Sequence, residues 1–412
     1  MIEISNFKKP LFIGGLLIAL KTKSYSELVN GDVSENVINA IKLAFNNNNL
    51  PLGDEFNFFK TDLNIKNVIL DTLTKICEDL LPKLKEDDSI DILGELYSTI
   101  DQKGLGIVLT PRHITGLFAE LADLNPDNSV VLDTCTGTGG FLIAAMSYMI
   151  NQANGDLETI DRIKSKGLIG IELDQHMFTL ACINMIFRGD GKANMFWDDS
   201  ISPRDDDLLN KIKEMRPNTA LINPPYSKKI KGKSELDFIL RTLDLLTEGG
   251  QCLAIVPLGA YTMETTENLE LRRQLLNKHT LKAVIQMPHD IFNNVNTITA
   301  ILVFEAHKPH LKDGMPICET WLADWNDDGH KIYNGVKTER EEGLWNKIKS
   351  EWLDAYFNQR VVPGISCKAP LNYSDEWVFE NYVETDYSKV DEEIFNTIRD
   401  YLIEKLSEVK LR

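Results

Sequence analysis

The chain has 412 residues, which predicts two or three domains, and its 43% hydrophobic and 26% charged content is ordinary for a soluble globular protein. Its net charge of −18, from 62 acidic and 44 basic residues, argues against a protein that coats DNA or an anionic membrane unaided, although local basic surfaces are allowed. Six scattered cysteines without a C-x-x-C pair favour free thiols in a reducing cytoplasm over a zinc knuckle or a disulfide framework. His307 and His310 share a segment, but we expect surface histidines there and no metal site.

Residues 1–100 predict a helical N-terminal domain. An apolar run at residues 11–20 follows Lys8 and Lys9 and has the length of a signal peptide, but no small-residue cleavage pattern comes after it. The run is also too short to span a bilayer, so a buried helix is favoured over an export signal, and no other segment approaches transmembrane length. From residue 24 to about residue 100, apolar residues recur at three- and four-residue steps, which is typical of helices.

A glycine-rich turn follows the first predicted strand. Residues 129–133 form a short apolar run, and residues 134–141 read Thr-Cys-Thr-Gly-Thr-Gly-Gly-Phe before an apolar helix at residues 142–150. Glycines let the backbone approach a ligand closely and point N–H groups at it. The turn lacks the full G-x-G-x-x-G pattern of dinucleotide enzymes, so by itself it is weak evidence for a ligand site.

The rest of this region alternates strands with helices. Further strands are predicted at residues 167–171, 193–197, 220–222, 252–256, 281–287 and 299–305, and further helices at residues 157–164 and 238–246. This alternation predicts an α/β fold with a mostly parallel sheet. A short connection at residues 292–296 permits an antiparallel pair at one edge.

The second strand ends in Glu172, which could accept the ribose hydroxyls of a nucleoside or simply be a solvated strand end. The third strand closes with Asp198 and Asp199.

The fourth strand ends in the turn Asn223-Pro224-Pro225-Tyr226. Prolines cannot donate to a sheet ladder, so this turn is stiff and lies at the carboxyl end of a strand, where open α/β sheets keep their chemistry. It offers a side-chain amide, a carbonyl group and a flat aromatic ring. These groups suit a planar amine that two acceptors hold while its ring is stacked on one face. By itself, such a tetrapeptide is a purely structural turn about as often as it is part of a binding site, so the residues around it decide between the two.

These motifs resemble a known family. Asp133 with its glycine turn, Glu172, Asp199 and residues 223–226 have the order and spacing of an amino-type DNA methyltransferase that uses S-adenosylmethionine. With Thr110-Pro111-Arg112 upstream, the chain most resembles the modification subunit of type I restriction-modification systems, a family of N6-adenine DNA methyltransferases. The resemblance is strong between residues 90 and 308 and weaker beyond.

The resemblance implies a Rossmann-like S-adenosylmethionine-dependent methyltransferase sheet over residues 101–310. A helical N-terminal domain would precede it, and a C-terminal interaction region at residues 311–412 would end in a helical tail. The implied cofactor-binding residues are Thr110, Pro111, Arg112, Asp133, Thr136, Gly137, Thr138, Gly139, Phe141, Glu172 and Asp199. Among them, Asp133 would face the amino group of the methionine part, Glu172 the ribose, and Asp199 the adenine amine. The chain departs from the usual family residues at Leu109, Thr134 and Thr136.

The implied reaction is methyl transfer to the N6 amine of adenine, whose lone pair is delocalised into the ring and is a poor nucleophile. Hydrogen bonds to the Asn223 side chain and the Pro224 carbonyl, within the stiff turn that Pro225 completes, would aim this nitrogen at the methyl group. A base inside a duplex must first be flipped out. Tyr226 would stack on one face of that base, and Phe292 is the family-based candidate for the other, with a core aromatic as the alternative.

Partners are suggested by what the chain lacks. Lys228, Lys229, Lys231 and Lys233 could contact DNA phosphates or form a solvated loop. The residues after 308 are acidic and carry five tryptophans, which predicts either a small core or an interface, not a basic DNA reader. We therefore expect a separate specificity subunit to read the DNA sequence, with two copies of this chain per complex. A restriction or translocase subunit is a further candidate partner.

The predicted terminal helix carries apolar residues at helical spacing and would pack against the specificity subunit; these residues are Ile394, Ile398, Leu402, Leu406 and Val409.

Two alternative functions of the chain are kept open. One is a methyltransferase of protein glutamine or RNA, because the same tetrapeptide occurs in enzymes that methylate glutamine. The other is a non-catalytic scaffold of a defence complex.

Overall fold

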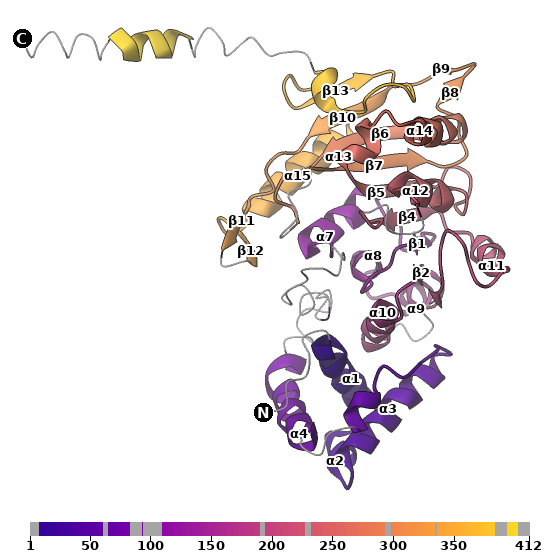
Figure 1. The fold of residues 1–412 in the computed structure, drawn as a ribbon. Helices are drawn as coiled ribbons and strands as arrows, with labels where there is room; N and C mark the ends of the chain where they lie inside the picture. The colour runs from indigo at the N-terminus through magenta and orange to yellow at the C-terminus, as the bar shows by residue number, and fades with distance from the viewer. Residues whose placement is uncertain are drawn as a thin grey trace, which may run out of the picture.

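The computed structural model describes residues 8–60, 65–82, 93, 109–189, 194–226, 232–292, 298–333, 336–383 and 394–402 (Figure 1). Several predicted features lie outside these residues: Lys228, Lys229 and Lys231, residues 293–296 of the connection at residues 292–296, and Leu406 and Val409 of the terminal helix.

The N-terminal part is helical, as predicted. Its described elements are α1 (Lys9–Thr22), α2 (Tyr25–Val29), α3 (Val33–Asn47), η2 (Asn57–Lys60), α4 (Ile65–Lys75) and η3 (Ile76–Leu80). Helix α2 begins at a capping box, in which the Ser24 N–H donates to Glu27 Oε2 at 2.9 Å. The apolar run is the buried helix α1, which packs against α3 and α10, so the prediction of a buried helix is confirmed. No helix among the described residues combines the length and apolar character needed to cross a bilayer.

A nine-stranded sheet with the order β13-β10-β6-β7-β5-β4-β1-β2-β3 forms the centre of the molecule. Its strands are β1 (Val131–Asp133), β2 (Leu168–Glu172), β3 (Asn194–Trp197), β4 (Thr219–Ile222), β5 (Gln251–Pro257), β6 (Thr280–Gln286), β7 (Thr299–Glu305), β10 (Thr320–Asp324) and β13 (Ser366–Ala369). Strands β5, β4, β1, β2 and β3 are parallel, whereas β7 is antiparallel to both β5 and β6. The predicted α/β fold is confirmed.

The antiparallel pair of β6 and β7 is not at an edge of the sheet, which corrects one prediction. Strand β10 pairs in parallel with β6, and β13 pairs with β10 in the antiparallel direction, so two further strands lie beyond β6. Both come from the region after residue 310, which we expected to be a separate interaction region. The unpaired N–H and C=O groups of β6 explain the extension, because an open strand edge gains hydrogen bonds from any strand that reaches it.

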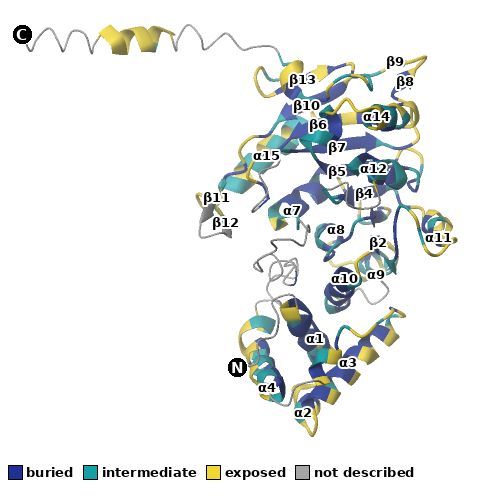
Figure 2. Cartoon of the chain, in the orientation of Figure 1, coloured by how far each residue is buried: buried dark blue, intermediate teal, exposed yellow. Residues whose placement is uncertain are grey.

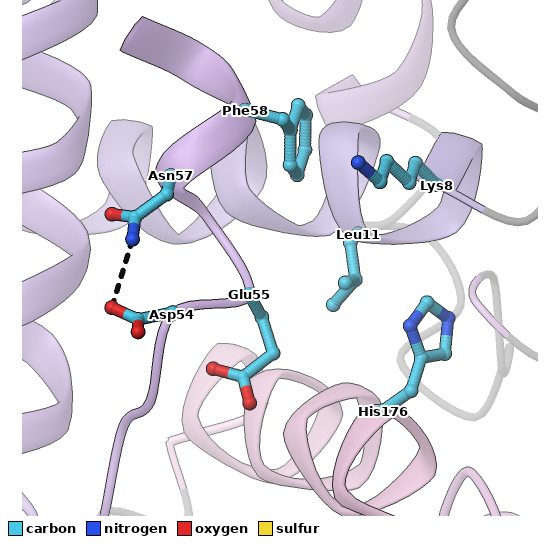
Figure 3. A pocket seen from close by; sticks show the side chains of 7 residues that line it. All are labelled: Lys8, Leu11, Asp54, Glu55, Asn57, Phe58 and His176. Atoms are coloured by element: carbon cyan, nitrogen blue, oxygen red, sulfur yellow. Dashed lines mark hydrogen bonds between the residues drawn. The ribbon is translucent and has the colours of Figure 1, made fainter. Parts of the chain in front are cut away.

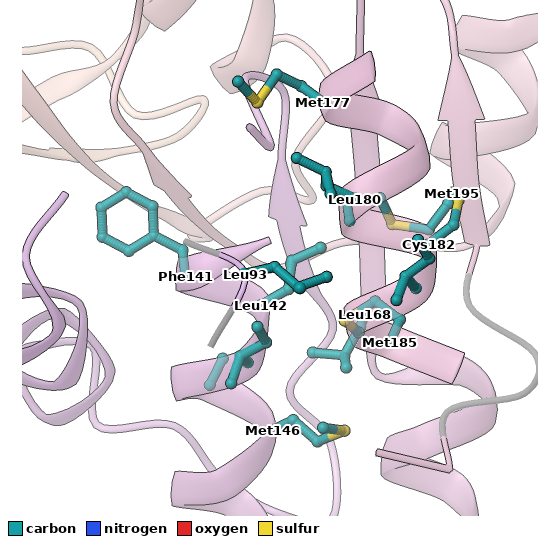
Figure 4. Packing of buried hydrophobic residues seen from close by; sticks show 14 of the residues in the cluster. Leu93, Phe141, Leu142, Met146, Leu168, Met177, Leu180, Cys182, Met185 and Met195 are labelled. Carbon is teal, nitrogen blue, oxygen red and sulfur yellow. The ribbon is translucent and has the colours of Figure 1, made fainter. Parts of the chain in front are cut away.

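Helices cover both faces of the sheet, and each face has its own hydrophobic core. The helices of the first core are the N-terminal α1, α3 and α4 together with α7 (Arg112–Leu121), α8 (Gly140–Gln152), α9 (Leu157–Lys166) and α10 (Gln175–Phe187), and α15 (Leu344–Phe357) packs against it. Those of the second are α11 (Leu208–Glu214), α12 (Glu235–Leu243), α13 (Leu258–Thr262) and α14 (Thr266–Lys278). Figure 4 shows methionines from α8, α10 and β3 filling the first core beside leucines. Figure 2 shows strands β4, β5, β6 and β7 in the middle of the sheet mostly buried.

The C-terminal region adds the hairpins β8 (Leu311–Lys312) with β9 (Met315–Pro316) and β11 (His330–Tyr333) with β12 (Val336–Glu339), followed by η4 (Phe379–Asn381). Its tryptophans mainly build a core. Trp321, Trp325 and Trp377 are fully buried, and the Trp325 ring stacks on Trp352 with centroids 4.6 Å apart. These three residues are therefore core residues, but Trp321 and Trp325 belong to the first core of the sheet and Trp377 to the second, and not to a small core of their own.

Two simpler expectations have different outcomes. All six cysteines are free thiols, as expected. His310 is buried and not on the surface, since its Nε2 lies 3.0 Å from the Leu371 carbonyl oxygen and its Nδ1 lies 3.3 Å from Cys318 Sγ. A histidine with two local hydrogen-bond partners can be buried without a metal, which the sequence spacing alone did not indicate.

Candidate active site

The glycine turn and the Asn-Pro-Pro-Tyr turn leave neighbouring strands at the same edge of the sheet. Strands β1 and β4 are parallel and adjacent, with Leu132 opposite Ala220. The turn after Asp133 and the turn after Ile222 therefore begin side by side at the carboxyl edge, where open α/β sheets bind their ligands.

The glycine turn is a tight, closed loop over the end of β1. The Thr136 hydroxyl donates to the Asp133 carbonyl at 2.9 Å, and the Gly139 N–H donates to the Thr136 carbonyl at 2.8 Å. Gly137 and Gly139 have φ values of 55° and 90°, which glycine adopts without strain. The Leu109 side chain lies over this turn, 3.9 Å from the position of a Cβ atom on Gly137. Leu109, one of the departures from the usual family residues, thus covers the glycine turn.

Two buried carboxylates lie beside the turn. Asp133 is 0% exposed; its Oδ1 accepts the Cys135 N–H at 2.9 Å, and its buried Oδ2 has no hydrogen-bond partner among the described residues. Burial raises the pKa of Asp133 to about 8. Glu172 accepts the N–H groups of Gly137 and Asp174, both at 2.8 Å, and burial raises its pKa to about 7. An unsatisfied buried carboxylate oxygen is costly, and a cationic amino group would satisfy it. These residues fit the cofactor that the motifs imply.

Asp198 and Asp199 follow β3 next to Glu172, and their carboxylates accept hydrogen bonds from backbone N–H groups of the turn that they begin. The Asp198 N–H donates to the Glu172 carbonyl at 3.1 Å, which joins the ends of β2 and β3. Asp199 Oδ1 accepts the N–H groups of Ile201 and Ser202 at 2.9 and 3.1 Å. Asp199 is buried, and its carboxylate shapes the loop that borders the candidate cofactor site.

Asn223 is held by a residue far away in the sequence. Its Nδ2 donates to the Thr110 hydroxyl at 3.0 Å, while its Oδ1 is buried without a hydrogen-bond partner in the described part of the chain. Pro111 precedes the first residue of α7 in an extended conformation, which lets the chain cross from Leu109 over the glycine turn to Asn223. The upstream motif and the Asn-Pro-Pro-Tyr turn are therefore joined directly, and one amide oxygen remains available to accept a hydrogen bond.

The two candidate stacking residues are in contact with each other. The rings of Tyr226 and Phe292 meet edge to face, with centroids 5.9 Å apart and planes at 82°. Phe292 is 3% exposed, and Tyr226 is half-buried, with burial raising the pKa of its phenol well above the ordinary value. A flat base does not fit between rings at this distance, so binding one there requires the rings to separate.

Other predicted site residues point elsewhere. Phe141 packs into the core against Phe118 of α7, with centroids 4.9 Å apart. Arg112 is exposed at the start of α7. Thr134, which stands where proline is usual, makes a buried hydrogen bond of 2.7 Å to the hydroxyl of Thr242 in α12. This departure from the family pattern therefore has a structural partner.

Sequence reasoning missed two residues that support the glycine turn. Thr242 holds Thr134, and the Asn184 side chain in α10 donates to the Thr138 carbonyl at 2.9 Å. Asn184 is a buried polar residue in the mostly apolar run of α10, and that contrast is a local signal that could have found it, whereas Thr242 lies in an amphipathic helix that gives no such signal.

A separate cavity of about 370 Å³ lies between the N-terminal helices and the start of α10 (Figure 3). Its lining residues are Lys8, Leu11, Asp54, Glu55, Asn57, Phe58 and His176. The predicted site residues are not among these, so the cavity is distinct from the site built by the two turns.

Comparison with known proteins identifies the family. The family model described as N-6 DNA Methylase matches residues 88–390, which is more than half of the chain. The chain belongs to this family. The match includes both turns and also β10 and β13, so the family region extends beyond residue 310.

Two curated relatives illustrate the match. The chain is 32% identical over 436 residues to the Type II restriction enzyme and methyltransferase RM.BcgI of Heyndrickxia coagulans, with 97% of this chain and 66% of that protein covered. It is 27% identical over 338 residues to the Type I restriction enzyme EcoKI methylase subunit of Escherichia coli, with 70% of this chain and 63% of that protein covered. The chain thus spans slightly less than two thirds of the length of these relatives.

Solved structures share the fold. The methyltransferase subunit of a type I restriction-modification system from Streptococcus thermophilus has a TM-score of 0.58 and 15% identity, covering 92% of this chain and 93% of that chain. A chain from a structural study of assembly and conformational transition in the type I R-M system has a TM-score of 0.63 and 17% identity, with coverages of 98% and 94%. Both likenesses extend over nearly the whole chain.

Proposed function

We propose that this chain is the methyltransferase subunit of a restriction-modification system and transfers a methyl group from S-adenosylmethionine to the N6 amine of a flipped adenine in DNA. The observation that carries the proposal is the Asn223 side chain. Its amide nitrogen is committed to Thr110, and its buried oxygen faces no partner in the described structure, one strand away from the glycine turn.

The chain's own residues act by positioning. Because adenine N6 carries two N–H groups and a delocalised lone pair, it needs two acceptors more than it needs a base. The Asn223 oxygen and the Pro224 carbonyl are those acceptors, and they favour a more tetrahedral nitrogen that is aimed at the methyl group. Proline at positions 224 and 225 keeps these acceptors in place, since its ring fixes φ.

The cofactor supplies a methyl group on a positively charged sulfur. Asp133 would hold the cofactor's amino group through its free buried oxygen, and Glu172 would hold the ribose. Residues 136–139 would line the methionine part, and Asp199 the adenine. Because burial raises the pKa of Asp133 to about 8, its carboxyl group keeps a proton near neutral pH until a cation arrives. Cofactor binding is therefore coupled to release of that proton.

The base would enter between Tyr226 and Phe292. These rings pack against each other at 5.9 Å, so the incoming adenine replaces an aromatic contact that already exists. We infer that Tyr226 stacks on the base after the rings separate, with Phe292 closing the other face. Exchange of one aromatic contact for another lowers the cost of opening the pocket.

Sequence recognition is assigned to a separate specificity subunit, with two copies of this chain in each complex and a possible restriction subunit. The acidic chain, with a net charge of −18, is poorly suited to hold DNA alone. Residues 394–402 form a helix that is exposed on most sides (Figure 2). Its exposed apolar residues are Ile394, Phe395, Ile398, Tyr401 and Leu402. An apolar helix face of this kind fits a helical partner.

The test is the Asn223→Ala variant, purified together with its partner subunit. Transfer of tritium from labelled S-adenosylmethionine into DNA should fall by about 10²-fold or more, since transition-state contacts are lost. Calorimetric affinity for S-adenosylmethionine should stay within about twofold, because Asn223 contacts the base and not the cofactor. Asn210→Ala, at an exposed position in α11, is the matched control. Undiminished methylation by Asn223→Ala would reject the proposed role.

A further inference from the structure

A buried polar cluster outside the methylation site joins three distant segments. Asp328 Oδ2 lies 2.8 Å from Lys337 Nζ and 2.9 Å from His113 Nε2. The side chains of Asp328 and Lys337 are 2% and 7% exposed, so this is a buried ion pair. Lys337 comes from β12, Asp328 from the loop before β11, and His113 from the first turn of α7.

Two members of the cluster are connected to the pocket. His113 lies three residues after Thr110, whose hydroxyl holds the Asn223 amide. Lys337 Nζ also donates to the Asp290 carbonyl at 2.9 Å, and Asp290 lies two residues before Phe292. The cluster therefore connects the side of the pocket that carries Asn223 with the side that carries Phe292.

Sheet topology explains why these segments meet. Strand β10 is parallel to β6, and β6 points in the same direction as β4 and β5, because β7 is antiparallel to both β5 and β6. The loops after β6 and β10 thus leave the same edge as the Asn-Pro-Pro-Tyr turn. Asp290 lies in the first of these loops and Asp328 in the second.

An aromatic ring packs against the cluster. The Trp345 ring of α15 meets the rings of His113 and His330 edge on, with centroids 5.2 and 5.8 Å away. Helix α15 is held on α7 by an ion pair between Lys349 and Glu120. Burial next to aromatic rings weakens screening by solvent, so the attraction between Lys337 and Asp328 is stronger than that of an exposed pair.

The same residues could be read as a metal site, because ligand atoms of His113, Asp328 and His330 lie within 4.8 Å of one another. The geometry favours the lysine instead. The ammonium group of Lys337 already occupies the position next to Asp328 Oδ2 where a cation would bind. The two histidine rings are stacked, with centroids 4.1 Å apart and planes at 24°, so their in-plane lone pairs run nearly parallel and do not converge.

Protonation states agree with an ion pair between Lys337 and Asp328. Burial lowers the pKa of His113, so its imidazole is neutral near pH 7 and donates its Nε2–H to the carboxylate. Burial works to raise the pKa of Asp328, but hydrogen bonds from His113 and Lys337 hold it well below its ordinary value. The carboxylate is thus charged and satisfied by these two donors at Oδ2 and by the His330 N–H, which donates to Oδ1 at 3.0 Å.

We propose that Lys337 and Asp328 are positioning residues for methyl transfer, which brace the start of α7 against the loop that carries Phe292 and so fix the two sides of the adenine pocket. This inference rests on the proposed function. Since misplacement of a reacting group by about 1 Å can cost about 10²-fold in rate, a brace at this position affects kcat more than cofactor binding.

The experiment compares Lys337→Met with wild type in the complete complex with its partner subunits. We expect kcat for DNA methylation to fall at least about tenfold, with KM for S-adenosylmethionine within about twofold, at a temperature where circular dichroism shows the variant folded. Lys337→Arg, which keeps the charge, should recover part of the loss. The matched control is Lys331→Met, an exposed position on the same hairpin, which should behave as wild type.

Hydrogen exchange gives a second readout that does not depend on methylation. In Lys337→Met, amides at residues 112–116 and 287–292 should exchange at least about tenfold faster than in wild type, while those of β2 should not change. Unchanged exchange in both segments, or a loss of cofactor affinity equal to the loss of kcat, would overturn the brace. So would one bound metal ion per chain by elemental analysis. If the wild-type complex methylates no adenine, the proposed function fails, and hydrogen exchange still decides whether the brace exists.

Discussion

Replacement of Thr110 by valine tests how Asn223 is oriented. Valine has nearly the same shape as threonine but lacks the hydroxyl that accepts the Asn223 Nδ2–H at 3.0 Å. Without this acceptor the amide can rotate, and it would then present its nitrogen to the adenine amine for part of the time. The Asn223 N–H and the adenine N–H cannot hydrogen-bond to each other, so the amine would not be held in place and methyl transfer should slow.

The magnitude follows from one hydrogen bond. A neutral hydrogen bond contributes about 0.5–1.5 kcal/mol net, and a buried polar group that loses its partner costs about 1–3 kcal/mol. If about 1–2 kcal/mol of this appears in the transition state, kcat falls by roughly 5- to 30-fold. Thr110 is half-buried, which places the expected loss within this range and below that of Asn223→Ala.

Single-turnover transfer of tritium to DNA measures this step without product release. Thr110→Ser keeps the hydroxyl and should retain most of the rate, while Thr110→Val should lose it with little change in affinity for S-adenosylmethionine. The family resemblance instead assigns Thr110 to the cofactor. If Thr110→Val weakened cofactor binding and left the single-turnover rate intact, the role of Thr110 as a support for Asn223 would be refuted.

Three further predictions concern the cofactor site and the core. Because burial raises the pKa of Asp133 from 3.8 to about 8, the native state keeps a proton that the unfolded chain has released, so the protein without cofactor should lose stability as pH rises towards 8. The affinity for S-adenosylmethionine should increase by up to about tenfold per pH unit over the same range, because binding releases this proton. Calorimetry on both sides of pH 8 measures this change in affinity. Gly139→Ala should lower the free energy of unfolding in urea by about 1–2 kcal/mol, since φ is 90° and the nearest atom, Ala181 Cβ, is 3.8 Å away, so the cost is backbone strain and not a clash. Trp321→Ala should lower it by about 3–5 kcal/mol, because that side chain is fully buried; a loss below 1 kcal/mol would place it outside the core.

The amino-acid sequence by itself determined the elements that depend on local patterns. Strand β7 has the predicted bounds, and most other predicted strands and helices differ by no more than three residues at each end. Apolar runs of strand length that are cut off by glycine or proline leave few alternatives. The order of strands and turns was enough to place the glycine turn and residues 223–226 at one edge, because parallel crossovers bring the carboxyl ends together.

Tertiary structure alone decided which side chains meet. Asn223 and Thr110 are 113 residues apart, Thr134 and Thr242 are 108 apart, and His113 and Asp328 are 215 apart. A polar side chain carries no local sign of its partner, because that partner is set by how whole elements pack. Long-range packing also accounts for β10 and β13, whose short sequences do not by themselves indicate strands. Strand β10 is stabilised by hydrogen bonds to the open edge of β6, and β13 by hydrogen bonds to β10. Local sequence therefore set the position of the Asn-Pro-Pro-Tyr turn, and long-range packing set the orientation of the Asn223 amide.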